Sequence, residues 1–336
     1  MRDQTRTEQS NEEGWGRLRN NGSGWGMNRR NFVKFAAQAT AAAALPAGAW
    51  AEPTAKYKPF AMGLLIKPSP NPEEKIALVR RLGFSTCFLS IDDYIGKFTP
   101  ELVRRMRDAL DKHQIIATTA EVVRPEPLKW NFLDGPPTIG IVPPKYRAAR
   151  MDALKQTSDF AKQLGIDRIQ THCGFMPENP RDPLYPGTVA AIKELTLHCA
   201  ANGQSFLMET GQETPTTMLR VIKDVNHPAL GVGLDTANLI LYGKANPVDA
   251  IKILGPYIRA MHAKDGKWPT NPMELGEEVV IGKGEVDFAK VFSGLKAAGY
   301  KGAVTIERET SGPQQIEDVR NEKLYLERIL AQQKIS

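Results

Sequence analysis

The sequence is poor in the residues on which several classes of protein depend. Its 336 residues include three cysteines, Cys87, Cys173 and Cys199. An odd number of cysteines without close spacing argues against a disulfide framework, and we expect all three to be thiols packed in the core. Lys and Arg outnumber Asp and Glu by only 44 to 38, so the charge gives no reason to expect binding to nucleic acid or to an anionic membrane.

Two longer patterns are also missing. Beyond the N-terminal segment, no apolar run approaches the roughly 20 residues that a spanning helix needs, so we expect no membrane span once that segment is removed. The first predicted strand, residues 60–66, leads into Lys67-Pro68-Ser69-Pro70 and not into a glycine-rich turn. The dinucleotide-binding fingerprint typical of a doubly wound sheet is therefore missing.

Residues 27–51 show the features of a twin-arginine export signal in the expected order. Arg29 and Arg30 are followed by an Ala-rich apolar stretch and by an A-x-A pattern at residues 49–51, which is typical of a cleavage site. We predict that this signal peptide is removed and that the protein is exported by the twin-arginine route to the periplasm or the extracellular space. The alternative is a basic, amphipathic helix that stays attached.

The segments on either side of this signal complete the predicted organisation. Residues 1–26 are polar and rich in Gly, so we predict that they are disordered or untranslated, with Met27 as the alternative start. Residues 52–336 are predicted to form a single domain. Removal of residues 1–51 takes away seven Lys/Arg and four Asp/Glu, which leaves 37 against 34 and a net charge of about +3.

Short apolar runs alternate with helical patterns through that domain. The predicted strands are residues 60–66, 86–91, 115–123, 168–174, 205–209, 230–235, 258–262 and 303–307. The predicted helices are residues 72–82, 99–114, 145–164, 188–202, 214–225, 247–254, 288–298 and 314–331. Eight strand–helix units predict an α/β fold of the (β/α)8 TIM barrel type, with a doubly wound sheet as the alternative. A loop over residues 125–144, rich in Pro and Gly, is long enough to suggest a role over the barrel mouth.

Four of the later strands each run into a side chain that can bind a metal ion. These side chains are Glu209, Asp235, His262 and Glu307. Taken alone, each is explained by a solvated carboxylate or a hydrogen-bonded core histidine. Because parallel strands end at the same face of a barrel, about 4.8 Å apart, the four together predict one site for a divalent cation with mixed oxygen and nitrogen ligands.

Four more polar side chains are expected at the same mouth. Glu121 and His172 lie at the ends of the third and fourth predicted strands, Asn238 lies one turn beyond Asp235, and Lys264 follows His262. We predict that they contact a substrate, and Lys264 could stabilise a developing oxyanion. The alternatives are loop-shaping roles for Glu121 and His172 and a solvated lysine for Lys264.

Five motifs in order, ETGQE, GLDTANLILYG, MHAKDG, GKGEVDF and TIERE, resemble the sugar phosphate isomerase/epimerase family of the xylose-isomerase-like TIM barrel superfamily. The resemblance covers the chain from about Phe60 onward. It implies a TIM barrel and one divalent metal ion (Mn, Co, Zn or Mg). By position, Glu209, Asp235, His262 and Glu307 match the family's metal ligands, and Glu209 and Glu307 also match its acid/base pair.

The resemblance implies a metal-dependent sugar isomerase or epimerase. Such an enzyme removes a proton next to a carbonyl through a metal-stabilised enediolate, and its partner is a small sugar or keto-sugar. One position departs from the family pattern, because Asn238 stands where many epimerases have His, and Asn carries no proton near neutral pH. A lyase or dehydratase for keto-sugars or keto-inositols and a non-catalytic carbohydrate-binding barrel stay open as alternatives. A homo-oligomer is compatible with each of these functions. The five histidines of the chain argue against the related AP endonucleases, whose zinc site is rich in His.

Overall fold

The computed structural model describes residues 53–54 and 56–335. The predicted signal peptide and the segment before it lie outside these residues. No helix among the described residues has the length and apolar character that crossing a bilayer requires. All three cysteines are buried and carry free thiols, as predicted.

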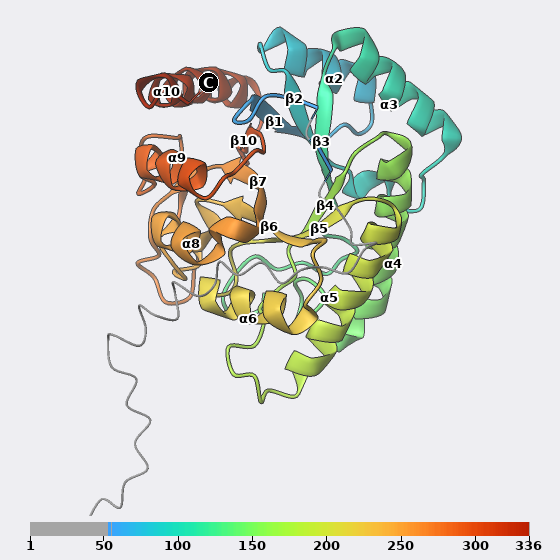
Figure 1. Cartoon of the computed structure of the whole chain (residues 1–336), viewed down its shortest axis with the longest axis vertical. Coiled ribbons are helices and arrows are strands. Elements are labelled where there is room, and N and C mark those ends of the chain that lie inside the picture. The colour runs from blue at the N-terminus through green and yellow to red at the C-terminus, as the bar shows by residue number, and fades with distance from the viewer. Residues whose placement is uncertain (1–52, 55, 336) are drawn as a thin grey trace, which may run out of the picture. The chain divides into compact units, whose positions relative to one another are not determined.

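Eight parallel strands close into a barrel, in the order β1-β10-β7-β6-β5-β4-β3-β2 (Figure 1). The strands are β1 (Met62–Ile66), β2 (Thr86–Ser90), β3 (Ile116–Glu121), β4 (Arg168–Thr171), β5 (Ser205–Glu209), β6 (Leu230–Asp235), β7 (Ile258–Ala263) and β10 (Val304–Ile306). The ring closes where β1 pairs with β10, with Met62 opposite Val304 and Leu64 opposite Ile306. The predicted TIM barrel is therefore confirmed, and the doubly wound alternative is wrong.

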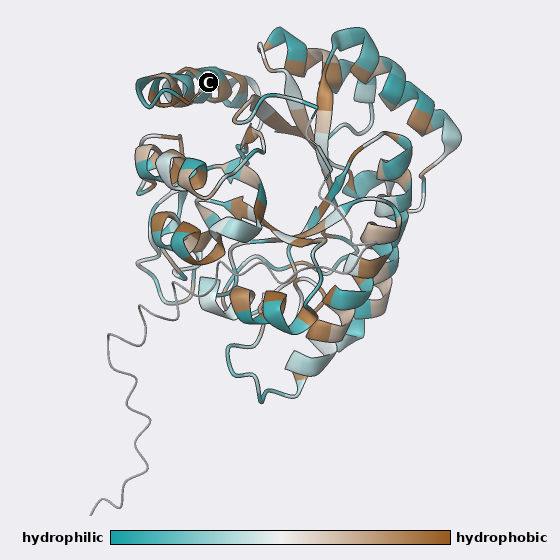
Figure 2. Ribbon diagram, in the orientation of Figure 1, coloured by the Kyte–Doolittle hydropathy of each residue, from teal (hydrophilic) through white to brown (hydrophobic). Residues whose placement is uncertain are grey.

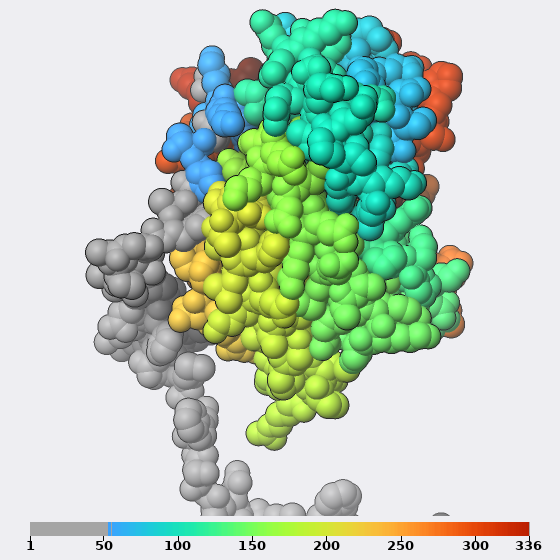
Figure 3. All heavy atoms as spheres, turned by 90° about the vertical axis from the view of Figure 1, so that its right-hand side faces the viewer, coloured from blue at the N-terminus to red at the C-terminus, as the bar shows by residue number. Residues whose placement is uncertain are grey.

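Helices connect the strands and cover the outside of the ring. They are α2 (Pro72–Arg81), α3 (Pro100–His113), α4 (Pro144–Gln163), α5 (Leu184–Ala201), α6 (Pro215–Val225), α7 (Asn238–Leu241), α8 (Pro247–Leu254), α9 (Phe288–Ala297) and α10 (Pro313–Gln332), with 3-10 turns η1 (Asp92–Tyr94) and η2 (Gly255–Tyr257). The strands are largely hydrophobic, whereas the helices contain both hydrophobic and hydrophilic residues (Figure 2). Figure 3 shows one side of the barrel, where α4 (green) lies against α5 (yellow-green).

Local sequence explains most helix boundaries. The hydroxyl of Thr99 accepts a hydrogen bond from the backbone N–H of Leu102 at 3.2 Å and caps α3. A side-chain oxygen of Asp287 accepts from the N–H of Lys290 at 3.0 Å and caps α9. These side chains satisfy N–H groups that lack partners within the helix.

The predicted start of α5 is wrong by four residues. The helix begins at Leu184, not at residue 188, although Pro186 and Gly187 in its first turn disfavour a helix locally. Proline is tolerated in a first turn because its missing N–H has no partner inside the helix. Tyr185 is buried and donates its hydroxyl to Asp224 at 2.5 Å, so a tertiary contact holds this turn in place.

Two glycines allow close approaches that shape the barrel and its mouth. A Cβ on Gly233 in β6 would lie 2.0 Å from the side-chain oxygen of Gln170, so glycine leaves room for Gln170 between β4 and β6. Gly140 has a φ of +71° and packs directly on the backbone of Cys173, and the neighbouring Ile141 N–H donates to Cys173 O at 2.9 Å. The long mouth loop is thereby attached to the residues that follow β4.

Candidate metal centre and substrate cavity

The four predicted metal ligands converge at the C-terminal mouth of the barrel. Their potential ligand atoms all lie within 4.8 Å of one another. Glu209 and Asp235 are the last residues of β5 and β6, and His262 is the last but one of β7. Glu307 lies one residue beyond β10, where its backbone N–H donates to Ala263 O at 3.1 Å. The register of neighbouring strands places Asp235 directly opposite His262.

His262 lies at the centre of the group. Its Nδ1 is 3.1 Å from Glu209 Oε1 and 3.0 Å from Glu307 Oε2, and Asp235 Oδ2 is 3.9 Å away. The imidazole ring packs edge-to-face on Phe88 of β2, with the ring centres 4.4 Å apart. An Nδ1–H group has one proton to donate, yet it faces carboxylates on two sides.

The electrostatics of the site follow from this crowding. Burial opposes the charged form of His262, but the carboxylates of Glu307 and Glu209 hold its pKa well above the ordinary value. Burial alone would raise the pKa of Glu209, whereas the nearby His172 and His262 lower it to about 2. Burial raises the pKa of Asp235 well above its usual range. The site therefore concentrates acidic groups that nearby cations neutralise only in part.

The residues fit a divalent cation. One buried oxygen each of Glu209, Asp235 and Glu307 accepts no well-aligned hydrogen bond within the described part of the chain, although histidine nitrogens lie 3.3 Å from Glu209 Oε2 and 3.0 Å from Glu307 Oε2. Buried polar atoms normally have hydrogen-bond partners, so these three oxygens indicate a bound group from outside the chain. Three carboxylates and one imidazole form a donor set that Mn, Co, Zn or Mg accept.

Lys264 lies at the edge of this centre. Its side chain is almost fully buried, and its Nζ lies 2.9 Å from Glu309 Oε1, 3.7 Å from Glu307 Oε2 and 3.9 Å from Asp235 Oδ2. Burial alone would lower the pKa of Lys264, but Glu307, Asp235 and Glu309 hold it well above the ordinary value. The ammonium therefore stays charged, and the predicted alternative of a solvated lysine is wrong because the group is buried.

Asn238 begins α7 and lies next to this lysine. Its backbone N–H donates to Asp235 Oδ1 at 2.6 Å, and its side-chain oxygen accepts from Lys264 Nζ at 3.4 Å. The backbone contact orients the carboxylate of Asp235, one of the candidate metal ligands. The side chain contributes to the cavity wall, in the position predicted for a substrate contact.

Glu121 and His172 form a second group with Glu209. One ligand atom of each lies within 4.8 Å of the others, and His172 Nε2 is 3.3 Å from Glu209 Oε2. The ring of His172 also lies within hydrogen-bond distance of the Gln212 amide, at 3.1 Å. Burial, together with the neighbouring Glu209 charge, raises the pKa of Glu121 well above its usual range. Sequence reasoning missed Gln212, although it lies in the ETGQE motif.

A cavity of about 450 Å³ opens above these groups. It is lined by the predicted residues Glu121, His172, Asn238 and Glu307, together with Tyr242 of the turn after α7. Such a volume is sufficient for a small-molecule ligand.

The long mouth loop contributes to the same cavity, as predicted, through Glu126, Leu128 and Trp130. Trp130 is 43% exposed, and its ring meets that of His172 edge-to-face at 5.0 Å. Sequence reasoning missed this tryptophan because a single aromatic residue in a loop has no periodic pattern.

A hairpin after β7 supports the site from outside. Its strands β8 (Asp265–Gly266) and β9 (Glu278–Val279) are antiparallel. The carboxylate of Asp265 accepts from the N–H groups of Gly282, Gly284 and Val286 at 2.9 to 3.1 Å. Asp265 therefore orders the GKGEVDF turn and does not point to a substrate.

The family follows from comparison with known proteins. A family model described as "Xylose isomerase-like TIM barrel" matches residues 76–329. The chain belongs to this family. The xylose isomerase domain protein from Planctomyces limnophilus is 31% identical with a TM-score of 0.77, and the match covers 82% of this chain and 98% of that one.

Other solved structures share the fold at lower identity. A xylose isomerase-like TIM barrel protein from Mycobacterium smegmatis, in complex with magnesium, is 18% identical with a TM-score of 0.63, covering 83% of this chain and 98% of that one. The 3-keto-D-glucoside 4-epimerase YcjR from E. coli is 14% identical with a TM-score of 0.60, covering 80% and 99%. Sugar 3-epimerases occur among further matches.

Curated relatives match over shorter stretches. An uncharacterised protein of Methanocaldococcus jannaschii is 23% identical over 176 residues, which is 49% of this chain and 58% of that protein. The uncharacterised protein YihM of Escherichia coli is 26% identical over 131 residues, which is 35% of this chain and 39% of that protein. The chain therefore matches less than two thirds of the length of these relatives.

Proposed function

We propose that this protein is a divalent-metal-dependent sugar isomerase or epimerase that moves a proton on the carbon next to a carbonyl. The observation that carries the proposal is the convergence of Glu209, Asp235, His262 and Glu307 beneath a cavity large enough for a sugar. The sugar epimerases with the same fold, and the magnesium complex among the structural neighbours, support it.

The chain's own residues supply the metal site and the proton transfers. Glu209, Asp235, His262 and Glu307 would hold the ion, which when bound acts as a Lewis acid toward a substrate carbonyl. Glu209 and Glu307 reach His262 Nδ1 from β5 and from the end of β10, strands on either side of β7. Two carboxylates in this arrangement can remove a carbon-bound proton and return one to the enediolate, from one side or from the other.

Neighbouring groups would orient the sugar. The buried ammonium of Lys264 places positive charge beside Glu307, where negative charge develops on a substrate oxygen. His172, Glu121 and Asn238 line the cavity as hydrogen-bonding groups for hydroxyls. Trp130 offers an aromatic surface on which the apolar face of a sugar ring can pack.

Metal content and isotope exchange test this proposal. We expect about one equivalent of divalent metal per chain after purification, and loss of both metal and activity on chelation. In heavy water, a recovered keto-sugar of unchanged composition should carry deuterium next to its carbonyl. A dehydrated or aglycone-free product would favour a lyase instead. Sugar binding that is indifferent to chelation, without deuterium exchange, would indicate a carbohydrate-binding protein.

One pair of variants tests the acid/base assignment. Glu307→Gln should lower turnover by at least about 100-fold, because the amide cannot exchange a proton. Glu317→Gln, at an exposed glutamate in α10, is the matched control and should retain turnover. Near-normal turnover of Glu307→Gln with bound metal would remove Glu307 from the mechanism.

The proposal includes export. It is supported only by the sequence of residues 27–51, because this segment lies outside the described residues. An exported enzyme would meet free or glycosidic sugars outside the cytoplasm, and this makes such sugars the proposed substrates ahead of sugar phosphates.

A further inference from the structure

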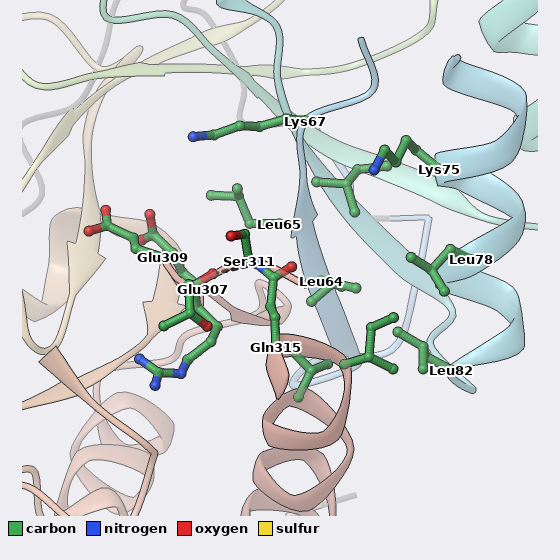
Figure 4. A pocket seen from close by; sticks show the side chains of 15 residues that line it. Leu64, Leu65, Lys67, Lys75, Leu78, Leu82, Glu307, Glu309, Ser311 and Gln315 are labelled. Carbon is green, nitrogen blue, oxygen red and sulfur yellow. Dashed lines mark hydrogen bonds between the residues drawn. The ribbon is translucent and has the colours of Figure 1, made fainter. Parts of the chain in front are cut away.

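A second hollow of about 360 Å³ lies beside the substrate cavity. It is bounded by β1, α2 and the segment that leads from β10 into α10 (Figure 4). Leu65, Lys67, Glu307 and Glu309 line both this side pocket and the substrate cavity. The two spaces therefore adjoin at one of the proposed proton-transfer residues, Glu307.

The walls of the side pocket differ in chemical character. Figure 4 shows Glu307 and Glu309 on one side, with Leu78 of α2 and Leu82, the residue after α2, on the opposite side. Leu64, Leu82 and Val319 are buried in the lining. The wall away from the metal centre is thus mainly aliphatic, which is typical of a site that binds an apolar group.

We propose that the side pocket binds the apolar aglycone of a keto-glycoside whose sugar ring reacts at the metal centre. This inference rests on the proposed function and names its substrate class. Glu307 and Glu309 lie where the main cavity meets the side pocket. A substituent on a sugar ring in the main cavity can therefore extend past these two residues toward Leu64, Leu78 and Leu82. An aryl group would remove aliphatic surface from water on this wall.

The charges of the lining give a phosphate no excess of positive charge. Lys67 and Lys75 line the pocket together with the carboxylates of Glu307 and Glu309, so these cations and anions balance. The guanidinium of Arg308 is already held by Glu278 at 2.6 Å and by Asp318 at 3.0 Å. The arginine in the lining is therefore engaged away from the pocket.

Substrate pairs test this inference directly. We expect kcat/KM to be about 10-fold or more higher for a phenyl 3-keto-glucoside than for its methyl counterpart, since the ring adds buried apolar area. Leu78→Trp and Ser311→Trp, which fill the pocket from α2 and from the loop before α10, should each bring this ratio close to one. Leu324→Trp, at a leucine of α10 that is 60% exposed, is the control and should keep the wild-type ratio.

Four results would overturn the inference. They are equal kcat/KM for the two glycosides in the wild type, a phenyl preference that persists in both filled variants, loss of the preference in the Leu324→Trp control, and a preference for a disaccharide over the phenyl compound. If the wild type turns over no keto-sugar, the proposed function fails, and the pocket is then tested by calorimetric binding of phenyl β-D-glucoside. Binding that both filled variants weaken about 10-fold supports the pocket; absent or unchanged binding overturns it.

Discussion

A buried glutamate at the outer edge of the barrel makes stability depend on pH in a way that one substitution can isolate. Glu322 of α10 is 1% exposed. Its Oε1 accepts a hydrogen bond from the backbone N–H of Ile281 at 3.1 Å, and its Oε2 has no partner among the described residues. Burial raises the pKa of Glu322 from 4.5 to about 7, although the Ile281 N–H and the nearby Arg308 act in the opposite direction.

The sign and size of the effect follow from this pKa. A raised pKa means that the folded protein holds the proton more tightly than the unfolded chain. The stabilisation is therefore complete below about pH 4.5 and is lost as the pH rises through 7. At 1.36 kcal/mol per pKa unit, the change from 4.5 to about 7 corresponds to about 3 kcal/mol.

Glu322→Gln removes the titration and keeps an oxygen that can accept from Ile281. We expect the free energy of unfolding of the variant, relative to wild type, to rise by about 3 kcal/mol between pH 4.5 and pH 8. The assay is urea unfolding followed by circular dichroism across this range at one fixed metal concentration. Any cost of placing the amide there is independent of pH and cancels in the trend.

The control is Glu317→Gln, at an exposed position on the same helix. Its free energy of unfolding relative to wild type should not change with pH. A difference between Glu322→Gln and wild type that stays constant within about 0.5 kcal/mol from pH 4.5 to 8 would refute the reasoning. Glu322 would then titrate alike in the folded and unfolded chain.

Three further changes have defined outcomes. Arg308→Met should cost about 3 kcal/mol in urea unfolding, because it leaves buried carboxylates without their cation; a loss below about 1 kcal/mol would contradict this. Trp130→Ala should raise KM for the sugar about 10-fold with a smaller change in kcat. Trp268→Ala, at a tryptophan of similar exposure, is the control and should leave KM unchanged. An equal effect of both substitutions on KM would contradict a sugar contact by Trp130. Replacing Arg29 and Arg30 with Lys should retain the protein in the cytoplasm, as cell fractionation would show, and continued export would contradict the twin-arginine signal.

The barrel and its candidate metal ligands were predictable because short-range signals carry them. Most of the barrel strands, such as β1 and β5, are short apolar runs, and a cap such as Thr99 or Asp287 is recognised from adjacent positions. Glu209, Asp235 and His262 could be placed together because parallel strands end at one face. The sequence could not show that Glu307 lies just past β10, since this depends on the pairing of that strand with β7.

The surroundings of the site depend on contacts between distant segments. Trp130 meets His172 across two different loops. Lys264 pairs with Glu309, which lies 45 residues further along the chain, beyond β10. The two-residue strands β8 and β9 are too short to give a period, and Asp265 supports them by accepting from backbone groups many residues away. No local propensity encodes such contacts, so they could not be predicted from the sequence.

The pairing of β1 with β10 has a consequence for biosynthesis. Strand β10 follows every other barrel strand in the chain order, and Glu307 comes after it. During translation the N-terminal strands emerge first, but the ring stays open, and the proposed metal site lacks one carboxylate, until β10 is made and pairs with β1. Metal binding would then report completion of the barrel. Under the proposed export by the twin-arginine route, the closed, metal-loaded barrel would be the state that leaves the cytoplasm.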